Sequence, residues 1–368
     1  MMKSNGSAIK AYVLLPASLD SECWLKNHST GLYPDMTPYG YHHAQGDGVE
    51  VVFSKLFPIP HGLYGLLVRS VRKLFGFDFL HIFKNLQLIN ASECNVVWTH
   101  TEFEFIFLIL ISKLSFGKLP PVICQSIWLA DKWNTYSSFK RWIYSWVLSR
   151  ADCLTFHSPL NFAFAEQKSW GKKRFLVEFG VSLDVFPLLP VKPIDVAAST
   201  IKVFSLGNDL HRDWDTLFSA FANDVRFELL VASSTFPKKF SASNIVVTQM
   251  KLSELIQAYS EADVVVIPLR HNLHASGVTT MLEAVSCGKP VVITDTGGLK
   301  HYLGDDCVFY VKVGSSSEIC DTVLSIALDS ELVHKKIVAA QRAIIEKKLF
   351  SAGFAERHVM LSRLLLEN

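Results

Sequence analysis

The sequence predicts an α/β fold with two domains, each built on a parallel sheet. The chain has 368 residues, more than one hydrophobic core usually supports, so two domains of roughly 180 residues each are expected. Short apolar segments rich in β-branched residues alternate with segments of helical spacing, which is typical of parallel strands joined by helices. This alternation starts again near residue 201, so the second half is expected to repeat the architecture of the first.

In the first half the elements follow a Rossmann-like order. Strands are expected near residues 10–15, 49–53, 95–99, 121–125, 152–156 and 175–177. Helices are expected near residues 39–45, 102–113, 138–148 and 160–167. Strands and helices that alternate in this way predict a layered domain with helices on both faces of the sheet.

Composition and charge narrow the function classes. The net charge is +2 and no long basic segment is present, so a nucleic-acid-binding protein is not indicated. Seven cysteines without a C-x-x-C pair are typical of reduced cysteines in the cytoplasm. The N-terminus lacks the long apolar region and cleavage site of a secretory signal. Residues 103–111 are apolar but interrupted by Glu104, and they are too few for a membrane span of about 20 residues. We therefore expect a cytoplasmic protein.

The most informative segment runs from residue 263 to residue 298. Residues 263–269 (DVVVIPL) predict a buried strand, and GKPVVIT predicts a turn and the next strand. The helix between them opens with small and hydroxylated residues, whose free N–H groups favour an anion: Ser276, Gly277, Val278, Thr279 and Thr280. Glu283 lies about one turn further on, where a carboxylate can accept hydrogen bonds from two ribose hydroxyls; the simpler alternative is an exposed helix carboxylate.

This segment resembles the donor-site signature of GT-B glycosyltransferases, especially glycosyltransferase family 4. The family motif has two glutamates separated by seven residues, then a small-residue turn and G-x-P-V-V. Glu283 matches the second glutamate, but Ala275 stands at the position of the first, with His274 as the nearest side chain that can substitute. The resemblance implies a nucleotide diphosphate sugar as donor, while Ala275 leaves the sugar and the stereochemistry open.

A second match lies at residues 201–221, IKVFSLGNDLHRDWDTLFSAF. A strand ends at Gly207, and helical spacing begins at Asp213. By resemblance, Arg212 stands at the position of the family's diphosphate-binding lysine, and Asn208 replaces an arginine. An arginine can bind phosphate oxygens through two N–H groups; the alternative is a solvated charge before a helix.

The resemblance extends to the domain organisation. Gly180, Val181, Asp184 and Phe186 match the end of the family's first domain, and a proline-rich linker follows. The expected domains are 1–187 for the acceptor, a linker at 188–199, 200–349 for the nucleotide sugar, and a helix at 350–368 that crosses back to the first domain. In GT-B proteins the two domains face each other across a cleft.

Catalytic candidates are expected after the strands of the first domain. His100 follows a strand and is expected to position or polarise an acceptor hydroxyl or the donor phosphate, or else to cap the next helix. Asp131 is the general base if the reaction inverts configuration; if it retains, Asp131 is an N-cap or an ion-pair partner. His42 and His43 are either acceptor contacts or surface histidines.

Neither a metal nor a cofactor is expected. The carboxylates form no D-x-D motif, and the histidines lack the spacing of metal ligands. Residues 61–84 combine bulky apolar residues with Arg69, Arg72, Lys73 and Lys84. Such a helix can lie at a lipid interface, as in bacterial GT-B enzymes that modify lipid-linked glycans, or it can pack in the core with its cations reaching solvent.

These observations predict a glycosyltransferase that uses a nucleotide diphosphate sugar, with a UDP-sugar favoured. The expected acceptor is a lipid-linked intermediate of a surface polysaccharide on the cytoplasmic face, and retention is favoured. Two alternatives remain, a GT-B UDP-sugar epimerase and a non-catalytic subunit that has lost activity through Ala275 and Asn208. A dinucleotide-dependent oxidoreductase is not favoured, because no G-x-G-x-x-G follows the first strand.

Overall fold

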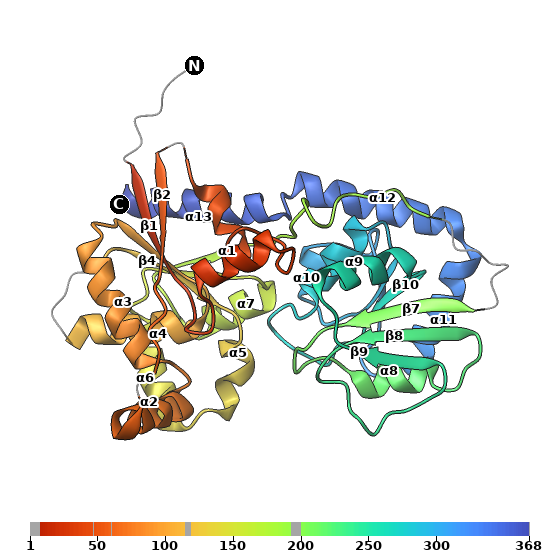
Figure 1. Cartoon of the computed structure of the whole chain (residues 1–368), viewed down its shortest axis with the longest axis horizontal. Helices are drawn as coiled ribbons and strands as arrows, with labels where there is room; N and C mark the ends of the chain where they lie inside the picture. The colour runs from red at the N-terminus through yellow and green to blue at the C-terminus, as the bar shows by residue number, and fades with distance from the viewer. Residues whose placement is uncertain (1–7, 47, 60, 115–118, 193–199, 368) are drawn as a thin grey trace, which may run out of the picture. The chain divides into compact units, whose positions relative to one another are not determined.

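The computed structural model describes residues 8–46, 48–59, 61–114, 119–192 and 200–367. The chain divides into two compact units, each with its own six-stranded sheet (Figure 1). The first unit contains Met1–Ser29, Asp35–Val177 and Ala352–Asn368, and the second contains Thr30–Pro34 and Glu178–Ser351. The expected linker at 188–199 lies mostly outside the described residues.

The first sheet has the strand order β2-β1-β3-β4-β5-β6, and all neighbours are parallel. Its strands are β1 Ile9–Leu14, β2 Val49–Phe53, β3 Val96–Thr99, β4 Val122–Ser126, β5 Cys153–Phe156 and β6 Lys173–Leu176. The predicted strands of this half are confirmed to within about two residues at their ends, the usual error of such boundaries.

The helices of the first unit cover both faces of this sheet. They are α1 Ser21–Ser29, η1 Pro38–Ala44, α2 Gly62–Phe75, α3 Phe79–Ala91, α4 Glu102–Leu114, α5 Leu129–Lys132, η2 Trp133–Thr135, α6 Ser138–Leu148, α7 Pro159–Gln167 and α13 Ser351–Leu366. The predicted helices at 102–113, 138–148 and 160–167 are confirmed. The one at 39–45 is a 3-10 segment, kinked because Tyr39 and Gly40 have positive φ angles.

The expectation of one helix over residues 61–84 is wrong. Gly76 ends α2 in the left-handed conformation, and Asp78 caps α3 by accepting a hydrogen bond from the backbone N–H of His81. The two helices differ in burial. Only Gly65 and Val68 of α2 are buried, whereas α3 buries six of its thirteen residues.

The C-terminal helix α13 packs in the first unit, as the predicted fold requires. The indole Nε1 of Trp98 in β3 donates to the hydroxyl of Ser362 at 2.8 Å. The imidazole of His358 lies against both Trp98 and Tyr41. Residues some 260 positions apart in the chain therefore share one core.

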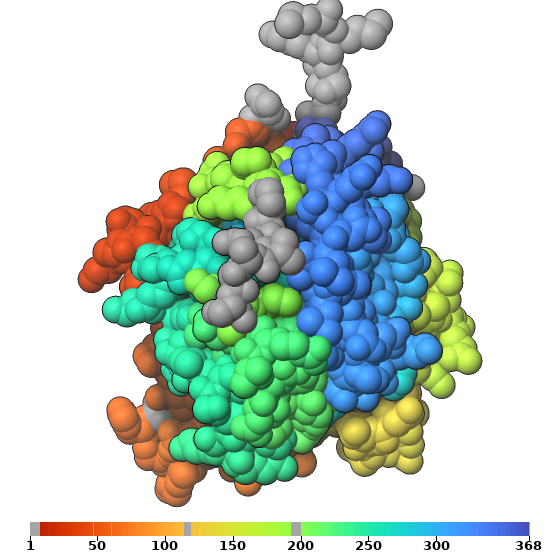
Figure 2. Space-filling model, turned by 90° about the vertical axis from the view of Figure 1, so that its right-hand side faces the viewer, coloured from red at the N-terminus to blue at the C-terminus, as the bar shows by residue number. Residues whose placement is uncertain are grey.

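The second sheet has the order β12-β11-β10-β7-β8-β9, again with parallel neighbours. Its strands are β7 Ile201–Leu206, β8 Phe227–Ala232, β9 Ile245–Thr248, β10 Val264–Ile267, β11 Val291–Thr294 and β12 Phe309–Val311. Its helices are α8 Trp214–Phe221, α9 Leu252–Glu261, α10 Val278–Ser286, η3 Leu299–His301, α11 Ser316–Leu328 and α12 Ser330–Glu346. Helix α11 packs on α8, and Figure 2 shows these segments as adjoining blue and green surfaces.

Each sheet has one point where the strand order reverses direction. In the first sheet the chain runs from β1 to β2 on one side, and later strands lie on the other side of β1. In the second sheet β8 and β9 lie on one side of β7, and β10 lies on the other. Such reversals open a crevice at the carboxyl ends of the strands, where ligands of α/β proteins bind. The two places to inspect are therefore the loops after β1 and β3, and those after β7 and β10.

Candidate functional site

In the second unit, the loops after β7 and β10 bring an arginine to the start of a helix. Gly277 is the N-cap of α10, with φ +87°, and no side chain caps this helix. The Arg212 guanidinium lies beside it, because a Cβ at Gly277 would be 3.0 Å from its Nη1. A Cβ at Gly207 would overlap the same guanidinium from the other side. The two glycines therefore create the space that Arg212 occupies.

Arg212 is buried, with 5% of its surface exposed. Its Nε donates to the carbonyl of Leu206 at 2.9 Å, and Nη2 donates to the hydroxyl of Thr280 at 3.2 Å. Among the described residues, Nη1 has no hydrogen-bond partner. Burial lowers the pKa of Arg212 to about 10, so it stays charged at neutral pH. A buried, charged N–H group without a partner is costly unless a ligand satisfies it.

Glu283 lies on α10 between one and two turns from this start. It is half-buried, and its Oε2 accepts a hydrogen bond from the hydroxyl of Tyr259 at 2.8 Å. Burial raises its pKa to about 7, although the Tyr259 bond and the charge of Arg212 oppose the shift. It is therefore not an exposed surface carboxylate, and near neutral pH it can both donate and accept hydrogen bonds.

The other predicted donor-site residues lie around the same helix start. Thr280 is buried and bonded to Arg212, while Thr279 is exposed and Val278 is half-buried. The hydroxyl of Ser276 is buried and lacks a partner among the described side chains and backbone. Asn208 is exposed, and its Oδ1 accepts from the backbone N–H of Ser234 at 2.8 Å. The side chain of Asn208, which follows β7, therefore holds the loop after β8.

Sequence reasoning overlooked an aspartate with two histidines at this edge. Asp209 Oδ1 accepts from the backbone N–H of His211 at 2.7 Å, and its Oδ2 lies 3.2 Å from His274 Nε2. Burial opposes ionisation of Asp209, but the contacts with His274 and His211 hold its pKa below the usual range. Ala275, next to His274, has a φ of +51°. The only signal in the sequence was the D-x-H spacing after Gly207.

His100, in the first unit, is buried against aromatic rings. Tyr39 stacks on its imidazole with a centroid separation of 3.2 Å, and the Tyr41 hydroxyl lies 3.3 Å from Nδ1. Burial, reinforced by His157 and His358, lowers its pKa well below the usual value. Burial therefore favours the neutral imidazole, and only 3% of the His100 surface is exposed.

Asp131 lies inside the short helix α5, whose N-cap is Trp128, so the suggested N-cap role is wrong. The His42 backbone N–H donates to the hydroxyl of Thr37, and His43 Nε2 lies 3.9 Å from Asp35. Asp35, His42 and His43 each place one possible ligand atom within 4.8 Å of the others, a grouping that linear spacing does not reveal. The expectation that no metal takes part stays a prediction.

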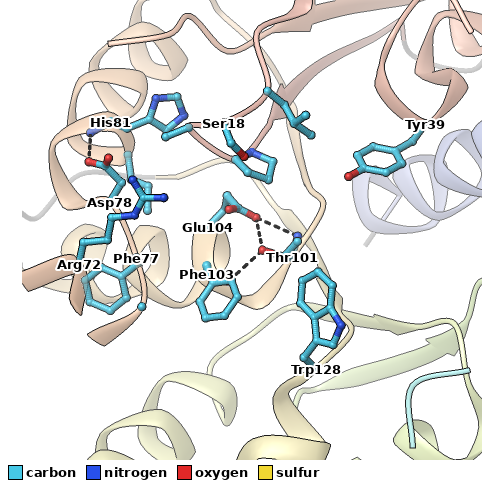
Figure 3. A pocket seen from close by; sticks show the side chains of 15 residues that line it. Ser18, Tyr39, Arg72, Phe77, Asp78, His81, Thr101, Phe103, Glu104 and Trp128 are labelled. Carbon is cyan, nitrogen blue, oxygen red and sulfur yellow. Dashed lines mark hydrogen bonds between the residues drawn. The ribbon is translucent and has the colours of Figure 1, made fainter. Parts of the chain in front are cut away.

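A pocket of about 380 Å³ opens where the first sheet reverses, after β1 and β3. Figure 3 shows Glu104 at its centre, with Phe103 and Trp128 on one side and Ser18 on the other. Glu104 is 4% exposed, and burial raises its pKa to about 8. Sequence reasoning treated this residue only as an interruption of an apolar segment. The T-x-x-E pattern of a capping box was the available signal.

Comparison with known proteins identifies a known domain in the second unit. Residues 208–329 match the family model described as Glycosyl transferases group 1. The chain carries a group 1 glycosyltransferase domain. The matched range includes Arg212, Gly277 and Glu283. The enzyme class predicted from the sequence, a glycosyltransferase, is therefore confirmed. No functionally curated protein matches the chain by sequence.

Solved structures confirm the GT-B fold of this glycosyltransferase over nearly its whole length. A sucrose-phosphate synthase from Thermosynechococcus elongatus matches at 16% identity with a TM-score of 0.70, covering 97% of this chain and 99% of its own. HepE from Anabaena, in complex with UDP and glucose, matches at 14% identity with a TM-score of 0.66, covering 95% and 98%. A trehalose-6-phosphate protein from E. coli bound with UDP-2-fluoro glucose matches at 10% identity, TM-score 0.65, covering 96% and 99%.

Proposed function

We propose that this glycosyltransferase moves a sugar from a nucleoside diphosphate sugar to a saccharide, with the diphosphate bound between Arg212 and the start of α10. The observation that carries the proposal is the buried guanidinium, whose Nη1 has no partner among the described residues. It lies beside a helix start that no side chain caps. Both groups supply hydrogen-bond donors and positive charge, which suits a diphosphate.

The nucleoside would lie further along α10. Glu283 is within one to two turns of Gly277, and its carboxyl group can hold two ribose hydroxyls. We propose uridine as the base. HepE is known in complexes with UDP and with UDP-glucose, and the E. coli protein with a UDP-sugar analogue. Both proteins share the fold of this chain, which supports testing UDP first.

Catalysis would come from orientation and from stabilising the leaving diphosphate. Positive charge fixed in advance at Arg212 and α10 lowers the energy of the charge that develops as the bond to the sugar breaks. We propose retention of configuration, with the acceptor proton taken by the leaving phosphate oxygen. His100 would then position the acceptor, and Asp131 would act as a base only in an inverting reaction. NMR of the product's anomeric proton separates these outcomes.

Nucleotide binding tests the donor site directly. Isothermal titration of the full chain with UDP, GDP and ADP is expected to show binding of UDP, and Arg212→Lys is expected to weaken it at least about tenfold, because the fork of two N–H donors is lost. Arg226→Lys is the control, since Arg226 is exposed and bonded to Asp224. Absence of binding by all three nucleotides would favour the non-catalytic subunit. Release of a free epimerised sugar from UDP-glucose without acceptor would favour the epimerase.

The acceptor is proposed to be a lipid-linked saccharide, reached at the cytoplasmic membrane face. Helix α2 exposes Leu63, Leu66, Leu67 and Leu74 at 85%, 54%, 56% and 68%. Exposed Arg69, Arg72 and Lys73 accompany them. Single exposed leucines are ordinary, but a group of four on one helix beside basic residues suits an anionic lipid surface.

A neighbouring helix, α6, also exposes aromatic side chains. Its Phe139 and Trp142 are each 66% exposed, and their rings stack at 6.2 Å. The hydroxyl of Tyr144 in α6 donates to the carbonyl of Phe75 at the end of α2, so the two helices are neighbours.

None of the described helices is both long and apolar enough to cross a bilayer. All seven cysteines are free, which supports a reducing compartment.

Vesicle sedimentation tests the lipid surface. The full chain is expected to sediment with vesicles containing phosphatidylglycerol and to stay in solution with phosphatidylcholine alone, because the basic residues need anionic headgroups. Leu66→Ser with Leu67→Ser is expected to abolish sedimentation. The control is Leu328→Ser, a leucine of the second unit that is 80% exposed. Equal sedimentation of all forms would refute this surface.

A further inference from the structure

The pocket of the first unit lies at the place in its sheet where α/β proteins bind ligands. Pro16 to Leu19 follow β1, Thr101 to Glu104 follow β3, and Trp128 follows β4. These loops meet at the β1–β3 reversal. Its volume of about 380 Å³ is within the range of small-molecule sites, and its lining of aromatic rings with a few polar groups is typical of them.

A structural role accounts for only one oxygen of Glu104. Its Oε2 accepts from the Thr101 backbone N–H at 2.9 Å and from the Thr101 hydroxyl at 2.6 Å, and the first of these is one of the two bonds of a capping box at the start of α4. Among the described residues, no hydrogen bond to Oε1 is present. The carboxyl group of Glu104 is also buried, whereas a side chain that caps a helix does not have to be buried. A carboxyl oxygen that borders a cavity and makes no hydrogen bond is a ready partner for a ligand hydroxyl.

The walls around Glu104 are aromatic. Phe103 and Trp128 lie with their ring centroids 6.4 Å apart and interplanar angle 29°, and Tyr39 lines the pocket as well (Figure 3). A pyranose ring has apolar C–H faces and polar hydroxyl edges, so it fits between aromatic faces and a carboxyl group. We propose that this pocket binds a pyranose ring of the acceptor, and that Glu104 forms a hydrogen bond with one of its hydroxyls. This rests on the proposed function, because the glycosyltransferase reaction supplies the saccharide acceptor.

Neighbouring residues hold this arrangement in place. Glu102 is fully buried, and its carboxylate accepts from the backbone N–H groups of Ile127 and Trp128 at 3.0 and 3.2 Å. This ties the loop after β4 to the start of α4, so Trp128 is fixed relative to Glu104. Gly76 leaves room for the Phe103 ring, since a Cβ there would be 2.9 Å from it. Glu102 and Gly76 are thus positioning residues for the pocket.

Ligand-observed NMR with simple glycosides tests the proposal. Saturation transfer from the full chain to a panel of methyl pyranosides (glucoside, galactoside, mannoside and N-acetylglucosaminide) is expected to mark at least one. Glu104→Gln keeps an oxygen for the Thr101 bonds but loses the carboxyl group, and it is expected to weaken that glycoside at least about tenfold. The control is Glu166→Gln, an exposed position on α7. Trp128→Ala is expected to reduce the signal further.

Monodeoxy glycosides identify the contact itself. Removing the hydroxyl that meets Glu104 is expected to weaken binding to the wild type more than binding to Glu104→Gln, because the amide nitrogen that replaces Oε1 cannot accept a hydrogen bond from that hydroxyl. No saturation of any glycoside, or equal loss of every deoxy analogue in both proteins, would overturn the proposal. UDP binding to the wild type and to Glu104→Gln is measured by titration in the same experiment. Normal UDP binding with no glycoside binding refutes the pocket alone, whereas no UDP binding by the wild type refutes the donor site.

Discussion

The two sheets reverse their strand order in the same way, but the side chains placed at the two reversals differ in kind. At β7–β10 the loops carry two glycines, a buried arginine and an uncapped helix start. At β1–β3 they carry aromatic rings and a buried carboxyl group. One edge offers donors and positive charge to an anion. The other offers apolar faces and one protonatable oxygen to a neutral polyol. The same topology therefore carries side chains that suit two ligand chemistries, and the segments after the strands decide which.

The largest effect is expected from removing the charge at the β7–β10 edge. Arg212→Met preserves much of the buried volume but removes the guanidinium, and kcat is expected to fall by about 10²–10³, the usual cost of losing one donor that stabilises developing charge. Sugar transfer measured with saturating donor and acceptor checks this. A rise in the KM for the donor with kcat unchanged would mean that Arg212 contributes only to donor binding.

A smaller effect is expected from narrowing the space around that charge. Gly207→Ala places a Cβ against the Arg212 guanidinium at a φ of +133°, so we expect weaker UDP binding and a loss of about 1–3 kcal/mol of stability from backbone strain and displacement. Titration and chemical denaturation measure the two. Gly314→Ala is the matched control, because its φ is +75° and nothing lies within 4 Å of the added Cβ. It should lose stability while binding UDP normally.

Glu104, at the β1–β3 edge, should affect how the free energy of unfolding depends on pH. The pKa of Glu104 is raised from its ordinary value of 4.5 to about 8 in the fold. The folded state therefore holds this proton more tightly, and the resulting stability is complete below pH 4.5 and is lost as the pH rises toward 8. Glu104→Gln is expected to lose less stability over this interval, by up to a few kcal/mol. Denaturation at pH 5 and pH 8 compares the two proteins, and identical slopes would contradict the raised pKa.

The smallest effect is expected from removing metal ions. If the diphosphate is held by Arg212 and α10 alone, EDTA should leave the transfer rate unchanged. A loss of activity that Mg²⁺ or Mn²⁺ restores would show that a cation also binds the diphosphate. The β7–β10 edge would then include a metal ion besides Arg212 and the start of α10. His43→Gln tests separately whether the group of Asp35, His42 and His43 in the first unit binds such a cation.

The sequence revealed much of one edge and little of the other, for a physical reason. Gly277 and Glu283 lie in a strand–helix–strand unit that is contiguous in the chain, so the spacing of residues predicts their positions. The pocket gathers Ser18 and Trp128 from two loops and Glu104 from the first turn of α4, and no local sequence pattern shows that these three residues meet. Asn208 shows the limit of matching positions, since its side chain reaches the loop after β8. Its partner could be found only in three dimensions.

The low burial of helix α2 lowers its local stability. With only Gly65 and Val68 buried among its fourteen residues, little free energy opposes its opening, so its amide hydrogens should exchange with solvent long before those of α4. A lipid surface that covers the exposed leucines would add the missing apolar contacts and slow that exchange. In this sense α2 would complete its folding at the membrane, and the energy that orders the helix would be part of the binding energy.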